Sequence, residues 1–157
     1  MKKLYMADNK IISPELIFLD EALSDKSEII KYIAKKAKAI GYIIDEQVFY
    51  ETVMKREAEV PTAIGYDIAI PHGKTDIIVQ PFIAFVRTKE KFIWTEGFED
   101  EVQLIFQIGV PETGNEKLHL KFISEVSKKL LNEEFREQLK SIVEHNAVFE
   151  LLNSIEV

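Results

Sequence analysis

The sequence predicts an α/β domain in which a central sheet is covered by helices on both faces. Three observations lead to this fold class. Apolar residues recur at helical spacing before residue 57 and again after residue 116. Between these segments, short runs of apolar and β-branched residues are bounded by proline and glycine, as in buried strands. No linker, repeat or low-complexity tract divides the 157 residues, so we expect one domain over residues 1–157.

The first part of the chain is expected to contain one extended segment and two helices. Residues 16–19 form a short apolar run, which we interpret as a strand or an extended entry segment. A helix should begin at Ser24 and Asp25 and end at Gly41, and a second helix should be capped by Asp45. The apolar stripe of the first helix consists of Ile29, Ile30, Ile33, Ala37 and Ile40.

The central part of the chain has the short apolar runs that are typical of strands. Residues 68–70 form a short apolar strand that should end at Pro71, because proline lacks the N–H that a strand ladder needs. Residues 82–87 and 102–110 are typical of buried strands, and residues 92–94 indicate another short strand between them. The order and direction of the strands do not follow from this pattern.

The last part of the chain is expected to be helical. Residues 116–130 should form a helix, and Phe135 and Leu139 belong to a second one. Asn146 is expected to cap a final short helix that reaches Leu152. The apolar stripe of the first of these helices consists of Leu118, Phe122, Ile123, Val126 and Leu130.

The composition excludes several classes of function. A net charge of −7 fits a nucleic-acid backbone poorly. The absence of cysteine excludes disulfides, thiol nucleophiles and cysteine-based zinc sites. We see neither a signal peptide nor an apolar run of the ~20 residues that span a bilayer, so we expect no membrane insertion, and a cytosolic location is compatible.

Motifs of the common catalytic classes are missing as well. The sequence contains no HExxH, no GxSxG, no Walker loop and no GxGxxG. We therefore expect neither a metal nor a cofactor. What remains for chemistry is a set of three histidines, His72, His119 and His145.

His72 is the most informative of these histidines, because an apolar strand and Pro71 should deliver it to an open rim. Gly73 should leave room beside the imidazole. With an ordinary pKa near 6.5, a neutral imidazole is available as a nucleophile at cytosolic pH, which suits a phosphoryl acceptor. The same pattern fits a strand-end histidine that only hydrogen-bonds to a carbonyl, and taken alone it favours that second interpretation.

Arg56 and Thr62 offer groups that a phosphoryl acceptor needs nearby. A guanidinium presents planar, permanently charged donors to the oxygens of a transferring phosphoryl group. Arg56, near the end of a helix, could fold back towards His72, and Thr62 could donate its hydroxyl proton to the phosphoryl group or to an imidazole. Considered singly, Arg56 is better explained as a cation near a helix C-terminus and Thr62 as a turn residue.

His119 lies in the first turn of its predicted helix, at a spacing from Ile123 and Val126 that borders the buried face. Helix N-termini attract anions, so His119 could help to hold a phosphoryl group without carrying it. A half-buried structural histidine explains the position equally well. His145 precedes the expected cap of the last helix and is interpreted as a surface residue.

Taken together, these segments resemble the signature of the fructose/mannitol-type enzyme IIA domains of the bacterial sugar phosphotransferase system. The spacing from Arg56 to His72, followed by the helix with the second histidine, carries the resemblance, which covers residues 16–152. The matching segments are residues 56–57, 61–62, 68–73, 81–85, 92–94, 102–106, 119–124 and 133–136.

The resemblance implies a mixed sheet between helical layers. It also implies that His72 accepts a phosphoryl group from the phosphocarrier protein HPr at the far imidazole nitrogen, which gives a tele-phosphohistidine. The group would then pass to a IIB domain and finally to a sugar that enters through a membrane IIC component. The arginine and second histidine that flank the acceptor correspond to Arg56 and His119, and Thr62 is a further catalytic candidate.

The resemblance also bears on the partner and the substrate. Because IIB domains of this family carry phosphate on cysteine and this sequence has none, the next acceptor is expected on a separate polypeptide in the cytoplasm. The pattern after Trp94 indicates fructose rather than mannitol or galactitol. Alternatively, the domain is a regulator of the nitrogen-related branch that signals through its phosphorylation state.

Overall fold

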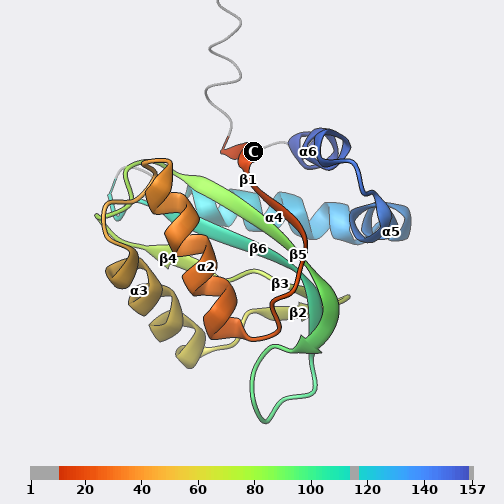
Figure 1. Ribbon diagram of the computed structural model, residues 1–157, viewed down its shortest axis with the longest axis horizontal. Coiled ribbons are helices and arrows are strands. Elements are labelled where there is room, and N and C mark those ends of the chain that lie inside the picture. Colours follow the sequence, from red (N-terminus) through yellow and green to blue (C-terminus); the bar gives the residue numbers. More distant parts are fainter. Residues whose placement is uncertain (1–10, 114–116, 156–157) are drawn as a thin grey trace, which may run out of the picture.

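The computed structural model describes residues 11–113 and 117–155, without the side chains of Leu118, His119 and Phe122. Its centre is one sheet of six strands (Figure 1). The strands are β1 (Ile12–Glu21), β2 (Ala63–Gly65), β3 (Ile68–Ala69), β4 (His72–Lys74), β5 (Phe82–Ile93) and β6 (Glu101–Val110). The three long strands, β1, β5 and β6, are neighbours, and the three short ones lie on the other side of β6.

The sheet is mixed, as the resemblance implied. β1 pairs in parallel with β5, and β5 pairs antiparallel with β6. On its other side β6 pairs in parallel with β3 and β4, and β2 closes this edge antiparallel to β3. The spatial order is β1-β5-β6-β3-β2, with β4 beside β6.

Helices cover both faces of the sheet, which confirms the predicted fold class (Figure 1). One face packs on α2 (Lys26–Ala39) and α3 (Glu46–Glu59). The other face packs on α4 (Leu118–Leu130), α5 (Glu133–Ser141) and α6 (His145–Asn153). None of the helices within the described residues is long and apolar enough to cross a membrane.

The alternation of side chains along the strands builds two hydrophobic cores. In β5, Ile83 and Phe85 face α4–α6, whereas Phe82, Ala84 and Val86 face α2 and α3. Successive side chains of a strand point to opposite faces, so a strand that is apolar throughout needs helices on both sides. Burial of both faces explains why the middle strands read as continuous apolar runs in the sequence.

The predicted boundaries at Gly41 and Asp45 follow the expected chemistry. The Asp45 side chain accepts a hydrogen bond of 3.0 Å from the Val48 N–H at the start of α3. Gly41 follows α2 with a φ of +84°, a conformation that glycine adopts without strain. The prediction for α6 was wrong: Glu144, rather than Asn146, caps this helix by accepting from the Ala147 N–H at 2.9 Å.

The expected short strand at residues 92–94 was wrong as a separate element. Phe92 and Ile93 are the end of β5, which continues along β6 after a register irregularity that follows Arg87. Side chains bridge this irregular stretch, since Thr88 donates its hydroxyl proton to the Glu90 carbonyl at 2.8 Å. The first strand is also longer than the apolar run that predicted it, because Ile12 and Glu21 at its two ends pair with β5 as well.

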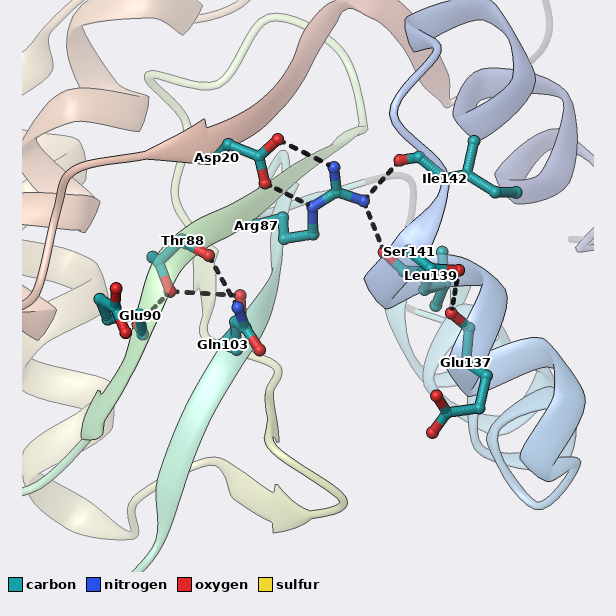
Figure 2. A network of polar contacts seen from close by, with 9 residues as sticks. All are labelled: Asp20, Arg87, Thr88, Glu90, Gln103, Glu137, Leu139, Ser141 and Ile142. Atoms are coloured by element: carbon teal, nitrogen blue, oxygen red, sulfur yellow. Dashed lines mark hydrogen bonds and ion pairs between the residues drawn. The ribbon is translucent and has the colours of Figure 1, made fainter.

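Arg87 joins the sheet to the C-terminal helices (Figure 2). Its side chain is only 2% exposed and donates to both carboxylate oxygens of Asp20 in β1, at 3.0 and 3.2 Å. The remaining terminal nitrogen donates to the carbonyls of Leu139 and Ile142 at the end of α5, at 3.0 and 2.7 Å. One guanidinium therefore satisfies two carbonyls of a helix terminus and one carboxylate.

Replacing this guanidinium should destabilise the fold. Arg87→Met keeps much of the buried volume but leaves the carbonyls of Leu139 and Ile142 without their donors, so the free energy of unfolding should fall by about 3 kcal/mol. Urea denaturation measures this change. Lys89→Met, at an exposed position of the same strand, is the control and should change stability by less than about 0.5 kcal/mol. Equal effects of the two substitutions would contradict the role given to Arg87.

Candidate functional site

His72 is the first residue of β4 and not the last residue of a strand. The chain pairs with β6 in one register on both sides of Pro71: Ile68 lies opposite Leu104, and His72 lies opposite Ile108. The strand before the proline, β3, ends at Ala69 as expected, but the expectation that pairing with β6 stops there was wrong, because it resumes in β4. Pro71 lacks an N–H, but its carbonyl still accepts from the Ile108 N–H at 2.9 Å, so pairing resumes immediately.

The orientation of the His72 ring is set by a backbone hydrogen bond. Nδ1 lies 2.9 Å from the carbonyl oxygen of Ile70. A carbonyl oxygen can only accept, so Nδ1 must carry the proton in this arrangement. A neutral imidazole has one protonated nitrogen and one lone pair, and the lone pair is then on Nε2. The half-buried ring therefore presents Nε2 as its nucleophilic nitrogen.

Gly73 allows a close approach between α3 and β4 that the sequence did not predict. A Cβ at this position would lie 2.9 Å from Cγ2 of Val53 and 3.5 Å from the ring of Phe49, both on α3. The missing side chain thus lets α3 approach β4. This close approach brings the last turns of α3, where Arg56 lies, to the same end of the sheet as His72.

Arg56 and His72 line one pocket of ≈ 460 Å³ at that end of the sheet. Arg56 donates from Nη1 to the Val60 carbonyl at 2.9 Å, which is the contact expected of a cation at a helix C-terminus. The two interpretations of Arg56 are therefore compatible, since the helix end is part of the pocket wall. Among the described side chains, the lining consists of Thr52, Lys55, Arg56, Glu59, His72, Gly73, Lys74, Val110 and Leu120.

The surroundings of His72 favour its neutral form. Burial is the largest cause and lowers the pKa of His72 below its ordinary value of 6.5. The Arg56 guanidinium lowers this pKa further, whereas the hydrogen bond to Ile70 and the Glu57 carboxylate raise it. The lowering effects prevail, so Nε2 keeps its lone pair at neutral pH.

Thr62 lies behind the pocket and is not part of its lining. Its side chain is buried, and its hydroxyl donates to Oε2 of Glu57. Its N–H donates to Oε1 of Glu57 at 3.3 Å, and its carbonyl accepts from the Ile70 N–H at 3.0 Å. In this arrangement the hydroxyl of Thr62 donates its hydrogen bond to the Glu57 carboxylate and not to an imidazole.

Glu57 is the functional candidate that sequence reasoning missed. It is 2% exposed and also accepts hydrogen bonds from the indole of Trp94 and the ammonium group of Lys26. A signal was present, because Glu57 follows Phe49 and Val53 at intervals of four residues and so continues the buried stripe of α3. A carboxylate on an apolar stripe must find partners, but the sequence does not reveal which ones.

The two other histidines differ in how far the structure describes them. His119 lies in the first turn of α4, but its side chain is outside the described part of the chain, so its role stays a prediction. His145 is exposed, as expected, with Nε2 at 3.1 Å from the carbonyl oxygen of Ile17. Among the side chains that the structure describes, which exclude that of His119, no three acidic or histidine groups are arranged as metal ligands would be.

Comparison with known proteins gives a consistent result. The family model "Phosphoenolpyruvate-dependent sugar phosphotransferase system, EIIA 2" matches residues 10–155. The fructose-specific EIIA component of Haloferax volcanii is 32% identical over 96% of this chain and 97% of that protein. The fructose-specific EIIABC component of Bacillus subtilis is 30% identical over 94% of this chain, which spans only 23% of that longer protein.

Two solved structures share the fold. The nitrogen regulatory protein IIA-Ntr of Neisseria meningitidis superposes with a TM-score of 0.81 at 26% identity, over 90% of this chain and 96% of that one. Enzyme IIA for mannitol from Escherichia coli, solved in complex with phosphorylated enzyme IIB, gives a TM-score of 0.75 at 25% identity. That match covers 89% of this chain and 95% of the other.

The lowered pKa of His72 has a measurable consequence. The ring should titrate with a midpoint below 6.5, which a pH series of imidazole NMR spectra measures. The unfolded chain, with its ordinary pKa, binds a proton more readily than the folded one. The free energy of unfolding should therefore fall as the pH drops from 6.5 to the folded-state pKa, and less so in His72→Gln. A midpoint at or above 6.5 would contradict this description of the site.

Proposed function

This chain belongs to the EIIA 2 family of the phosphoenolpyruvate-dependent sugar phosphotransferase system, and from that premise we propose that it is a phosphocarrier with His72 as the acceptor. His72 takes a phosphoryl group from phospho-HPr and passes it to a cysteine of a separate IIB protein. The observation that carries the proposal is the hydrogen bond between Nδ1 of His72 and the Ile70 carbonyl, because it assigns the nucleophilic lone pair to Nε2.

The proposed transfer uses the groups that surround the ring. The Nε2 lone pair attacks phosphorus, the new N–P bond forms, and the bond from phosphorus to the donor breaks. Arg56, in the wall of the same pocket, stabilises the charge on the equatorial oxygens. We assign His119 as a second ring that helps to hold the phosphoryl group. Thr62 contributes indirectly, since its hydroxyl is bonded to Glu57.

The second transfer reverses the first and needs an acceptor outside these 157 residues. This sequence has no cysteine, so the thiolate that attacks the phosphohistidine lies outside these 157 residues, in our proposal on a IIB protein. The related enzyme IIA in complex with phosphorylated enzyme IIB supports this partner. The phosphoryl group then reaches a sugar at a membrane IIC component. A carrier that exchanges phosphate with HPr works in the cytoplasm.

We propose a fructose-like sugar as the final acceptor. The two curated relatives described above are named fructose-specific, which agrees with the pattern after Trp94. Mannitol and galactitol are the alternatives. The structural similarity to a nitrogen regulatory IIA protein supports a second candidate function, in which the phosphorylation state of His72 controls a partner protein. Transfer from this protein to a purified IIB, coupled to sugar phosphorylation, would count against a purely regulatory role.

Phosphorylation of His72 is the first expected outcome. Incubation with phosphoenolpyruvate, enzyme I and HPr should add one acid-labile phosphoryl group, seen as a mass increase of the intact protein. His72→Gln should abolish the increase, because the substitution removes the ring that presents its lone pair on Nε2. His145→Gln is the matched control and should be phosphorylated normally. An increase that survives in His72→Gln would exclude this residue as the acceptor.

Arg56→Lys should slow the transfer by about tenfold, because an ammonium group cannot reproduce the two parallel donors of a guanidinium. Rapid-quench measurement of the initial rate from phospho-HPr tests this. Arg136→Lys makes the same chemical change outside the pocket, on α5, and should leave the rate unchanged. If the two variants react equally fast, Arg56 does not contact the transferred group.

A further inference from the structure

The buried Glu57 carboxylate takes no part in the transfer steps described above, yet it is surrounded by donors. Oε1 accepts from Nε1 of Trp94 at 2.9 Å, from Nζ of Lys26 at 3.1 Å and from the N–H of Thr62 at 3.3 Å. Oε2 accepts the hydroxyl proton of Thr62. The Glu57 carboxylate is only 2% exposed, and a buried charge is unfavourable unless it is paired and hydrogen-bonded. These four donor contacts therefore compensate the cost of burying the carboxylate.

The hydrogen bonds continue from Thr62 to the reacting ring. The carbonyl of Thr62 accepts from the Ile70 N–H at 3.0 Å, and the carbonyl of Ile70 faces Nδ1 of His72 at 2.9 Å. Glu57 holds both donor groups of Thr62, Thr62 holds the backbone of Ile70, and Ile70 holds the imidazole. An unbroken series of contacts therefore leads from a buried carboxylate to the proton on Nδ1.

The opposite side of the same segment is fixed as well. Gln107 is fully buried in β6, and its side-chain nitrogen donates to the carbonyls of Pro71 at 3.2 Å and Ile108 at 3.1 Å. Residues 70–72 are thus tied to β6 on one side and to Thr62 on the other. If the hydrogen bond from the Ile70 N–H to the Thr62 carbonyl is weakened, the Ile70 carbonyl becomes free to change its orientation.

We propose that Glu57 is a positioning residue, which acts through Thr62 and Ile70 to keep the acceptor carbonyl in place for the Nδ1 proton of His72. The proposal rests on the proposed phosphotransfer function, because it concerns how the nucleophile is held. Only the tautomer with the proton on Nδ1 has its lone pair on Nε2. When the carbonyl moves, the ring also populates the other tautomer, and the nucleophilic fraction falls.

Glu57 can also act on His72 through space, since its charge raises the pKa of the ring. Among the described residues, the other charged groups that line the pocket with the ring are Arg56, Lys55 and Glu59 on α3, and Lys74 on β4. Two variants separate the two effects. Glu57→Gln removes the charge and weakens the contact with Thr62, whereas Thr62→Val keeps the charge and removes only the hydroxyl link. Thr62→Ser retains the hydroxyl and should restore the behaviour of the native protein.

The primary measurement is the tautomer of His72 in the unphosphorylated protein, from the ¹⁵N shifts of its two ring nitrogens at pH 7.5. The native ring should carry its proton on Nδ1. Glu57→Gln and Thr62→Val should each show a measurable fraction with the proton on Nε2, and their initial phosphorylation rates should fall at least about tenfold. Thr62→Ser should match the native protein, as should Glu51→Gln, which removes an exposed carboxylate from the same helix.

Two outcomes would overturn the proposal. In the first, folded Glu57→Gln and Thr62→Val keep both the native tautomer and the native rate. In the second, Glu57→Gln lowers the pKa of His72 while Thr62→Val changes neither readout, which would leave only an effect of charge. If Glu57→Gln fails to fold, the comparison of Thr62→Val with Thr62→Ser tests the proposal. Equal tautomer fractions and equal rates in these two variants would then overturn it. Failure of HPr to phosphorylate the native protein would count against the proposed function, and the tautomer measurement would still judge the role of Glu57.

Discussion

The hydrogen bond between Nδ1 of His72 and the carbonyl of Ile70 is the interaction on which the proposed chemistry of this protein depends. A neutral imidazole has one proton and one lone pair, so fixing the proton on one nitrogen assigns the nucleophile to the other. Partial burial, reinforced by the Arg56 guanidinium, keeps the ring neutral at the pH of a cell. Tautomer and charge state are therefore both set before any partner arrives, which reduces the reorganisation that transfer requires.

The fold provides this geometry through a strand that is interrupted but not ended. β3 and β4 keep one register along β6 on both sides of Pro71, so the histidine stands on a supported backbone instead of a loose loop. Gly73 lets α3 approach closely enough for Arg56 to reach the same pocket. On the far side of the sheet, Arg87 ties the C-terminal helices to β1, which keeps the second helical layer in place.

Much of this could be predicted from the sequence, because periodicity reports which faces are buried. The layered fold, the Asp45 cap and the meeting of Arg56 with His72 follow from such patterns and from the spacing of the family signature. The continuation of β4 after Pro71 could not be predicted, since a proline carbonyl pairs as well as any other and only the partner strand reveals it. The role of Glu57 depends on Trp94 and Lys26, which are distant in sequence and meet only in the fold.

The measurement that tests this account most directly is the site of the N–P bond. In protein labelled with ¹⁵N-histidine and phosphorylated through HPr, coupling between ³¹P and ¹⁵N identifies the nitrogen that carries the phosphoryl group. The hydrogen bond to Ile70 requires the coupling at Nε2 of His72, with Nδ1 still protonated. Coupling at Nδ1 of His72, or at a ring nitrogen of His119 or His145, would contradict the account.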